Sequence, residues 1–294
     1  MNGYRPPLVV ASSEIAASIR SICSSNDALE SLEQIIRTDD IESLPLLASC
    51  EWRRFSAQMR TAFAFRDHVV VKGLPVSADG ATLLVATLTI GAMFRTYRGG
   101  QIIKHFKMSP WTTDLSHTIR EGEFHTDLNT ESQPPAITAM QCLDSDPGAP
   151  HFGANRVARL TDLVAFFKKC EDKSMLRFLT QDKVTMLNDR SVSTWEGCII
   201  ENGAIRYHPE TLRAAARRSG SPMPALQEQI ASIASAALSV SEPFILDSGD
   251  ILLLSNHRTL HYRGECSVVF KKFPTEFLAR SIFILHASKE LKGS

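Results

Sequence analysis

The sequence predicts one mainly β domain with helical elaborations, an α+β arrangement of 294 residues. The first 66 residues show helical periodicity, and most of the later chain consists of short apolar runs between turn residues. Two further helices interrupt those runs before the last strands. The chain has no alternating βα pattern and no G-x-G-x-x-G motif, which argues against a nucleotide-binding parallel sheet. No linker or internal repeat divides residues 1–294.

Apolar residues spaced three and four apart predict a helical N-terminal segment over residues 1–66. The helical stretches are residues 13–19, 29–36 and 51–65. The β-branched run from His68, ended by Gly73 and Pro75, predicts the first strand. Residues 78–93 are expected to form a helix with Ser77 as its cap.

From Gln101 onward, most of the predicted elements are strands. Residues 136–143 form an apolar run that is followed by strong turn residues, and this predicts a strand. Asn202-Gly203 between two short apolar runs is the clearest hairpin signal in the chain. The other expected elements are helices at 161–169, 209–218 and 225–238, and strands at 244–246, 251–255 and 277–285.

The composition is that of an ordinary globular protein, with 44% hydrophobic and 22% charged residues. The 32 basic residues balance the 32 acidic ones, so nucleic acid is not expected as a partner. The six cysteines have no paired spacing, which argues against a zinc ribbon or a disulfide scaffold and predicts reduced thiols in the cytoplasm. No secretory pattern is present, and no apolar run approaches the ~20 residues that span a membrane.

The candidate site centres on His125 and Asp127. On a β-strand, side chains two residues apart point to the same face, so these two would converge while Thr126 faces away. One imidazole and one carboxylate are two-thirds of the 2-His-1-carboxylate set that binds non-haem Fe(II). The second histidine would come from a distant strand, and His261 is the candidate.

His-x-Asp alone is a weak signal, because two surface residues of an edge strand would give the same pattern. A second histidine that lies two residues before an acidic residue occurs at His208-Pro209-Glu210. Proline is favoured at the first helical position and an acidic residue in the first turn, so Pro209 and Glu210 are expected to begin a helix.

The C-terminal stretch supports the metal-site hypothesis. The pattern G-D-[apolar strand]-x-N-x-R-x-[apolar]-H-x-R is matched by Gly249, Asp250, Asn256, Arg258, Leu260, His261 and Arg263. Together with residues 69–75, the Pro134-Pro135 step and residues 204–207, it resembles the taurine dioxygenase and clavaminate synthase-like family of Fe(II)/2-oxoglutarate oxygenases. The similarity covers roughly residues 65 to 286.

The resemblance implies a double-stranded β-helix, or jelly-roll, core over residues 67–286 with a helical insert at about 209–238. It also implies that His125, Asp127 and His261 hold Fe(II). Strand alternation by itself does not distinguish His261 from His257, because residues four apart lie on the same face.

These enzymes bind the far carboxylate of 2-oxoglutarate with an arginine on the strand after the distal histidine, which corresponds to Arg280. An arginine in an apolar strand needs a partner, and a guanidinium grips a carboxylate through two hydrogen bonds. An outward-facing Arg280 is the alternative, with Lys271 or Lys272 as the anchor. Asn155 lies where relatives often carry a threonine and is expected to donate a hydrogen bond to the cosubstrate.

The implied activity is hydroxylation of an unactivated C–H bond with Fe(II), 2-oxoglutarate and O2, releasing succinate and CO2. The expected substrate is a small polar metabolite, an amino acid or derivative in specialised metabolism. No catalytic residue beyond the metal ligands is predicted. Because Asp127 supplies a carboxylate, a halogenase, which carries Gly or Ala there, is disfavoured. Desaturation and ring formation use the same ligands and stay open.

The segment from Arg95 to Trp111 is rich in cations and aromatic residues. Lys104 and Trp111 are therefore candidates for binding an anionic substrate group, and Arg258 is a further candidate. A solvated loop is the alternative interpretation of this segment.

Three other functions are compatible with these residues. A jelly-roll sensor that binds a metal or small ligand would not need Arg280. A zinc-dependent hydrolase would use His125, Asp127 and His261 to hold zinc. A hydroxylase of protein or nucleic acid would keep the chemistry and change the substrate, although the balanced charge argues against nucleic acid.

Overall fold

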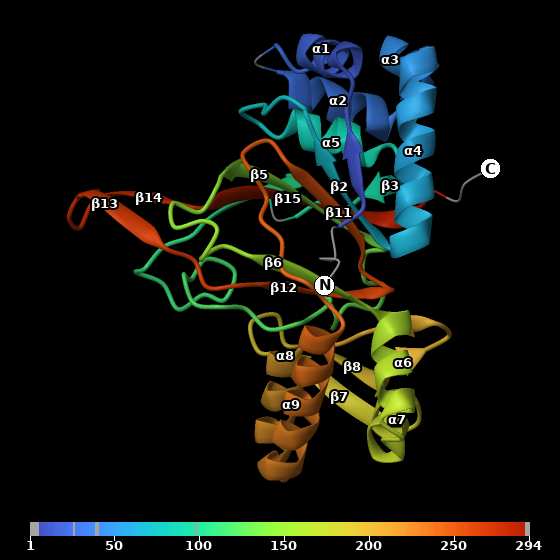
Figure 1. Ribbon diagram of the computed structural model, residues 1–294, viewed down its shortest axis with the longest axis vertical. Coiled ribbons are helices and arrows are strands. Elements are labelled where there is room, and N and C mark those ends of the chain that lie inside the picture. The colour runs from blue at the N-terminus through green and yellow to red at the C-terminus, as the bar shows by residue number, and fades with distance from the viewer. Residues whose placement is uncertain (1–5, 26, 39–40, 98, 292–294) are drawn as a thin grey trace.

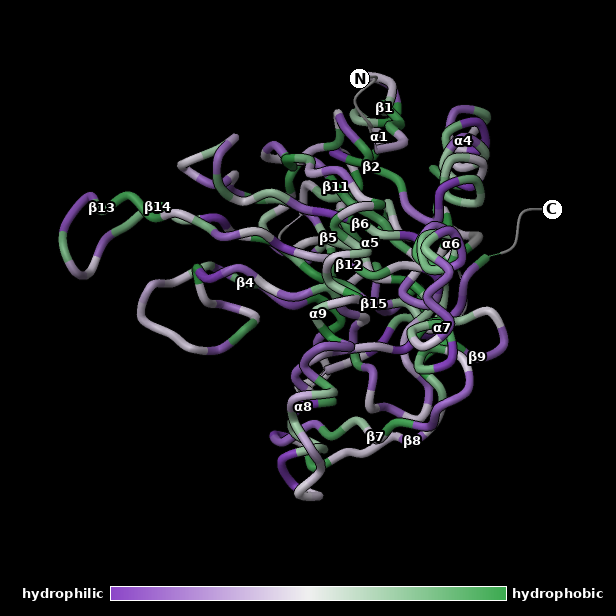
Figure 2. Tube along the Cα trace, turned by 60° about the horizontal axis from the view of Figure 1, so that its bottom comes forward, coloured by the Kyte–Doolittle hydropathy of each residue, from purple (hydrophilic) through white to green (hydrophobic). Residues whose placement is uncertain are grey.

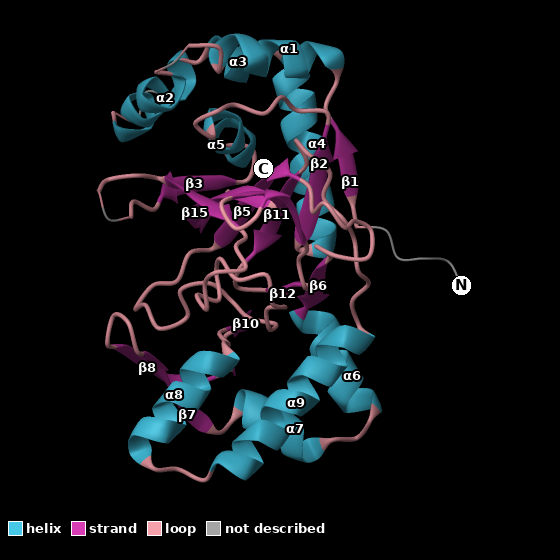
Figure 3. Ribbon diagram, turned by 90° about the vertical axis from the view of Figure 1, so that its left-hand side faces the viewer, coloured by secondary structure: helices cyan, strands magenta, loops and turns pink. Residues whose placement is uncertain are grey.

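A large β-sheet lies between two groups of helices in the computed structural model, which describes residues 6–25, 27–38, 41–97 and 99–291 (Figure 1). Figure 3 shows the strands in the middle of the molecule and helices at both ends. Within the described residues, none of the helices has the length and apolar character needed to cross a membrane.

Helices make up most of the described part of the first 66 residues, as the periodicity predicts, and they cover one face of the sheet (Figure 1). They are α1 Ser13–Ile22, α2 Ala28–Arg37, the 3-10 helix Ile41–Ser43, α3 Pro45–Ala48 and α4 Cys50–Arg66. The side chains of Ser12 and Ser49 cap α1 and α4 by accepting backbone N–H groups.

The next helix, α5 Ala81–Thr87, is shorter than the predicted helix at 78–93. Ser77 does accept a backbone hydrogen bond at its start, from the N–H of Thr82. The prediction fails at its C-terminal end, because residues from Gly91 pair with the last strand of the large sheet. Tertiary pairing overrides the local apolar periodicity there.

The large sheet has the strand order β1-β2-β11-β5-β15-β3, and β4 also pairs with β15. Its strands are β1 Leu8–Val10, β2 His68–Lys72, β3 Gly91–Phe94, β4 Ile103–Lys107, β5 Ile137–Asp144, β11 Ile251–Ser255 and β15 Ser281–Glu290. All neighbours are antiparallel except β1 and β2. The sheet therefore joins strands from both ends of the chain, including β1, which was not predicted.

Alternate residues of this sheet face two different cores. On β11, Ile251 and Leu253 pack against the N-terminal helices, whereas Leu252 and Leu254 face the opposite, inner side. Because both faces are buried, the strand is a continuous apolar run rather than an alternating one.

A two-stranded sheet faces the inner side of the large sheet and completes the jelly-roll core. It consists of β6 Asn155–Arg159 and β12 Thr259–Arg263, which pair antiparallel with His261 opposite Val157. Val157 packs with Met140 and Leu252 in the inner core. Neither strand was predicted from periodicity, and β12 is the strand that carries the distal histidine.

The insert is larger than the predicted 209–238. It comprises α6 Leu160–Lys169, α7 Lys173–Thr180, the hairpin β7 Lys183–Asn188 with β8 Ser193–Cys198, the short hairpin β9 Ile200–Glu201 with β10 Ala204–Ile205, α8 Pro209–Ser219 and α9 Met223–Ser239. These elements share a hydrophobic core of their own, to which Leu163, Met186 and Ile233 contribute. The early helices belong to the insert because α6 and α7 pack against α9.

The C-terminal region contains one more hairpin than predicted. β13 Val268–Lys272 and β14 Glu276–Ala279 pair with each other and project from the body of the molecule (Figures 1 and 2). The predicted strand at 277–285 is divided between β14 and β15, with Arg280 at the junction. The predicted strand at 244–246 contributes only a single β-bridge, between Phe244 and Asn155.

Candidate metal centre

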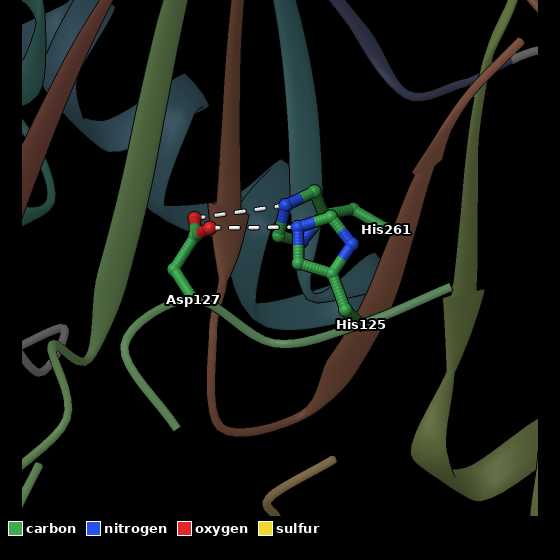
Figure 4. A group of neighbouring side chains, drawn as sticks. All are labelled: His125, Asp127 and His261. Atoms are coloured by element: carbon green, nitrogen blue, oxygen red, sulfur yellow. Dashed lines mark ion pairs between the residues drawn. The ribbon is translucent and has the colours of Figure 1, made fainter. Parts of the chain in front are cut away.

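His125, Asp127 and His261 come together at the edge of the inner core (Figure 4). His125 and His261 form a β-bridge, in which each backbone N–H donates to the other's carbonyl at 3.0 Å. The carboxylate of Asp127 lies 3.6 Å from Nε2 of both histidines, through Oδ1 to His125 and Oδ2 to His261. One ligand atom from each residue therefore lies within 4.8 Å of the other two.

The local backbone differs from the predicted strand, because only His125 has a β partner and Asp127 begins a turn. Asn256 holds that turn. Its Oδ1 accepts the N–H of Asp127 at 2.7 Å, and its Nδ2 donates to the carbonyls of Asp127 and Pro135 at 3.0 Å. Asn256 is buried, so the amide ties the turn to the segment before His261. The convergence of His125 and Asp127 thus depends on a third residue rather than on strand alternation alone.

Thr126 faces away from the two ligands, as predicted. It is buried, and its N–H and hydroxyl both donate to the carbonyl of Tyr207, at 2.7 and 3.2 Å. This contact fixes the segment against the part of the insert that precedes α8. His208 follows Tyr207 and caps α8, because its Nδ1 accepts the N–H of Glu210. The expected helix start at Pro209 and Glu210 is confirmed.

The two histidines can each present Nε2 to a metal. Nδ1–H of His125 donates to the carbonyl of Glu123 at 2.7 Å, which leaves the Nε2 lone pair facing Asp127. Burial, followed by the nearby His125, lowers the pKa of His261 to about 3, so this ring is neutral. Burial also opposes charge on His125, but Asp127 outweighs it and raises the pKa of His125.

The carboxylate of Asp127 is kept ionised. Burial raises its pKa, but the surrounding histidines, His261 first, lower it well below its usual range. Thr138 donates to Oδ2 at 2.7 Å, and Nε2 of His286 lies 3.0 Å from the same oxygen. Two imidazole nitrogens and one ionised carboxylate are the donor set of a non-haem Fe(II) centre, and zinc accepts the same ligands.

Arg280 faces the interior, which overturns the alternative of an outward-facing side chain. It is 2% exposed and donates to the carbonyl of Gly153 at 2.9 Å and to Oδ1 of Asn155 at 2.8 Å. Among the described residues, no carboxylate forms an ion pair with it. A buried guanidinium bound only to neutral oxygens leaves its charge uncompensated, so the site fits an added carboxylate.

Asn155 is the residue that orients Arg280, since its Oδ1 accepts from the guanidinium. Lys271 and Lys272, the alternative anchors, lie exposed on the projecting hairpin. The structure therefore does not support an anchoring role for either lysine.

The three predicted substrate residues lie in different surroundings. Nζ of Lys104 lies 3.8 Å from the centroid of the Tyr97 ring. Trp111 is 58% exposed and contacts Phe270 and Phe273 of the hairpin. Residue 98, in the same segment, lies outside the described residues.

Arg258 has structural partners, which do not support its proposed role as a substrate residue. Its guanidinium forms ion pairs with Asp67 at 2.5 Å and Glu290 at 2.9 Å, which link the end of α4 to the end of β15. These two carboxylates occupy its donors. His257 is separate from the three clustered residues, and its Nε2 lies 3.4 Å from the carbonyl of Pro134.

Sequence reasoning missed three residues that surround Asp127, namely Thr138, His286 and Asn256. Thr138 and His286 are polar residues inside otherwise apolar strands, which is the signal that would have found them. Asn256 was part of the family pattern, but its role was not predicted. A buried polar side chain needs a partner, so each of these positions pointed to a local polar site.

A jelly-roll core with a 2-His-1-carboxylate cluster defines a non-haem iron oxygenase type of centre, and comparison with known proteins gives the family. Residues 42–267 match the family model described as "Taurine catabolism dioxygenase TauD, TfdA family". The chain belongs to this family. It is therefore an Fe(II)/2-oxoglutarate-dependent dioxygenase, with O2 as the second cosubstrate. A comparison with curated proteins found no match.

Solved structures share the fold at low sequence identity. Asparagine oxygenase in complex with Fe(II), a 3-hydroxyasparagine and succinate is 14% identical, with a TM-score of 0.70 over 97% of this chain and 94% of that one. The oxygenase OrfP in complex with Fe and alpha-ketoglutaric acid is 13% identical, with a TM-score of 0.62 over 96% and 94%. PvcB from Pseudomonas aeruginosa is 14% identical, with a TM-score of 0.57 over 79% of each chain.

Proposed function

We propose that this enzyme hydroxylates an unactivated C–H bond of a small, amino-acid-like molecule and releases succinate and CO2. Two features of the same domain carry this proposal: the His125, Asp127 and His261 cluster, and a buried Arg280 that has no carboxylate partner among the described residues. The first is a place for iron, and the second is a place for the far carboxylate of the keto acid.

In this proposal, Nε2 of both histidines and a carboxylate oxygen of Asp127 hold the iron. Arg280 grips the far carboxylate of 2-oxoglutarate with its remaining N–H donors, and Asn155 keeps the guanidinium in place. Bound iron supplies the oxygen-activating chemistry. The fixed side chains around the site would orient both cosubstrate and substrate.

The amino-acid class is supported by two of the matched structures. Asparagine oxygenase was solved with 3-hydroxyasparagine and succinate, and OrfP with Fe, succinate and a 3-hydroxy-arginine. We propose a substrate of the same general class here. All six cysteines are free thiols, in keeping with the cytoplasmic location that we propose.

Lys104 is the proposed contact for an anionic group of the substrate. On neighbouring strands, Lys104 lies opposite Ile284, and Ile284 lies opposite Met140, so all three side chains share the inner face of the sheet. His286 is two residues from Ile284 and shares that face. Among the described residues, no carboxylate forms an ion pair with Lys104. The carboxylate of an amino-acid substrate would give Lys104 an ion-pair partner.

Anaerobic addition of Fe(II) and 2-oxoglutarate tests the proposed function. The keto-acid chelate is expected to give a weak visible charge-transfer band that His125→Ala and His261→Ala lack. Substrate-dependent succinate release is then measured for a panel of L-amino acids. A protein that gives no band with iron, yet hydrolyses esters or amides with zinc, would be the alternative zinc hydrolase. A band without turnover of any tested compound would favour the sensor.

The proposed substrate contact is tested by Lys104→Met with Lys107→Met as the matched control. Lys107 lies on the same strand but is exposed and points to the opposite face. We expect Lys104→Met to raise the KM for the amino acid at least tenfold while the keto-acid band stays unchanged. An equal effect of the two substitutions would remove Lys104 from the substrate site.

A further inference from the structure

The two oxygens of the Asp127 carboxylate have different surroundings. Oδ2 receives the hydroxyl of Thr138 at 2.7 Å and faces Nε2 of His286 at 3.0 Å. Each oxygen also faces the Nε2 atom of one ligand histidine at 3.6 Å, Oδ1 that of His125 and Oδ2 that of His261, which is too long for a good hydrogen bond, and Oδ1 accepts no hydrogen bond from the described residues. Oδ2 is therefore occupied by two protein donors, and Oδ1 is left for another partner.

Both donors to Oδ2 of Asp127 come from one cross-strand pair of residues in the large sheet. His286 on β15 lies directly opposite Thr138 on β5, and side chains at such a pair point to the same face. The two histidine ligands come from the opposite side of the barrel, through the bridge between His125 and His261. One carboxylate oxygen is thus held by the rigid centre of the large sheet while the ligand histidines belong to the other layer.

Tyr97 determines which ring nitrogen of His286 carries the hydrogen. Its hydroxyl forms a hydrogen bond with Nδ1 of His286. Since Nε2 must carry a hydrogen to donate to a carboxylate, Nδ1 is the acceptor, and the tyrosine is the donor. Burial, followed by the charge of Asp127, raises the pKa of Tyr97, which keeps the hydroxyl protonated. The loop that carries Tyr97 is attached to β15 through the N–H of Arg95, which donates to the carbonyl of His286 at 2.9 Å.

We propose that Thr138 and His286, with Tyr97 behind them, are positioning residues that make Asp127 ligate iron through Oδ1 alone. The inference rests on the proposed metal site. A carboxylate bound through one oxygen occupies one coordination position, so with two histidines it leaves three positions of an octahedral ion. A two-point keto-acid chelate and dioxygen would need all three, whereas a carboxylate bound through both oxygens would take one of them.

The test measures metal and keto-acid binding rather than turnover. Co(II) affinity is measured by titration, and 2-oxoglutarate affinity is then measured anaerobically from the Fe(II) charge-transfer band. The variants are His286→Ala, His286→Gln and Tyr97→Phe, with His105→Ala as control, because His105 is an exposed histidine on the neighbouring strand. Thermal unfolding of each metal-free variant reports its packing.

We expect His286→Ala to weaken Co(II) binding by about 10- to 100-fold, the usual effect of losing a residue that orients a metal ligand. The apparent affinity for 2-oxoglutarate should fall further, because a released carboxylate competes for the chelate position. Gln, whose side-chain N–H can reach Oδ2, should restore most of both affinities, and Tyr97→Phe should have a smaller effect in the same direction. His105→Ala should bind like the wild type.

Two results would overturn this inference. One is wild-type affinity for both Co(II) and 2-oxoglutarate in His286→Ala. The other is a loss that Gln does not restore and that matches the loss of thermal stability, which would make His286 a packing residue. A wild-type protein that binds neither Co(II) nor Fe(II) would instead contradict the proposed function itself. Failure of this inference and failure of the proposed function are therefore distinguishable.

Discussion

Replacing Arg280 should uncouple cosubstrate binding from metal binding. Arg280 is buried and has no carboxylate partner among the described residues, so the far carboxylate of 2-oxoglutarate would be its anionic partner. Removing one member of a buried, hydrogen-bonded charge pair costs about 2–5 kcal/mol. At about 1.4 kcal/mol per tenfold, Arg280→Gln should weaken 2-oxoglutarate binding by about 30-fold to several thousand-fold.

The assay compares two keto acids in the same protein. 2-Oxoglutarate carries the far carboxylate and pyruvate lacks it, while both chelate a metal in the same way. The wild type should prefer 2-oxoglutarate by the factor that Arg280→Gln loses, and the variant should bind the two keto acids almost equally. Co(II) affinity should stay unchanged, because Arg280 contacts none of the three ligands.

Stability has to be followed alongside binding. Arg280→Gln removes the donors to Gly153 and Asn155, and an unsatisfied buried acceptor costs about 1–3 kcal/mol. Arg258→Gln is the control, because it also removes an arginine that forms several hydrogen bonds but should leave the keto-acid preference intact. If Arg280→Gln still distinguishes 2-oxoglutarate from pyruvate as strongly as the wild type, another residue anchors the cosubstrate.

Three further predictions concern stability. Arg258→Gln should lower the free energy of unfolding by about 1–3 kcal/mol, which is less than for a fully buried ion pair because Arg258 is partly exposed to solvent. Urea unfolding measures this change. An unchanged midpoint would contradict the structural role of the ion pairs with Asp67 and Glu290. Burial lowers the pKa of His68 to about 4, so the folded protein binds fewer protons than the unfolded chain between its usual pKa of about 6.5 and about 4. Stability should therefore fall as pH decreases through that window, by about 2 kcal/mol near pH 5 from this residue, and His68→Gln should show a correspondingly weaker pH dependence of unfolding. His208→Ala should lower the free energy of unfolding by about 1 kcal/mol, because α8 loses its cap. His208→Asn should keep the cap, since asparagine is a preferred capping residue. Equal stability of the two variants would argue against the capping role.

Local patterns together with the family resemblance singled out the three clustered residues and Arg280. His125 and Asp127 were recognised by their spacing, and His261 by the pattern around it. A lone arginine in an apolar strand marked Arg280, since burying a charge requires a reason. The structure brings the three residues together and buries Arg280, while their roles toward iron and 2-oxoglutarate stay predictions.

The partners of these residues were decided by the tertiary structure. The same pattern that identified His261 also contained Arg258, yet Arg258 pairs with Asp67 and Glu290. His286 meets Thr138 only because β15 pairs with β5 in one particular register, and a shift of one residue would turn His286 to the other face.

Sequence alone thus predicted a mainly β fold with two histidines, a carboxylate and an arginine as its candidate site residues. The tertiary structure decided which oxygen of Asp127 accepts no hydrogen bond and which arginine lacks a carboxylate partner among the described residues. It also decided which strands face each other. The physical reason is that side-chain direction follows from local backbone geometry, whereas hydrogen-bond partners depend on the register between strands that are far apart in the chain.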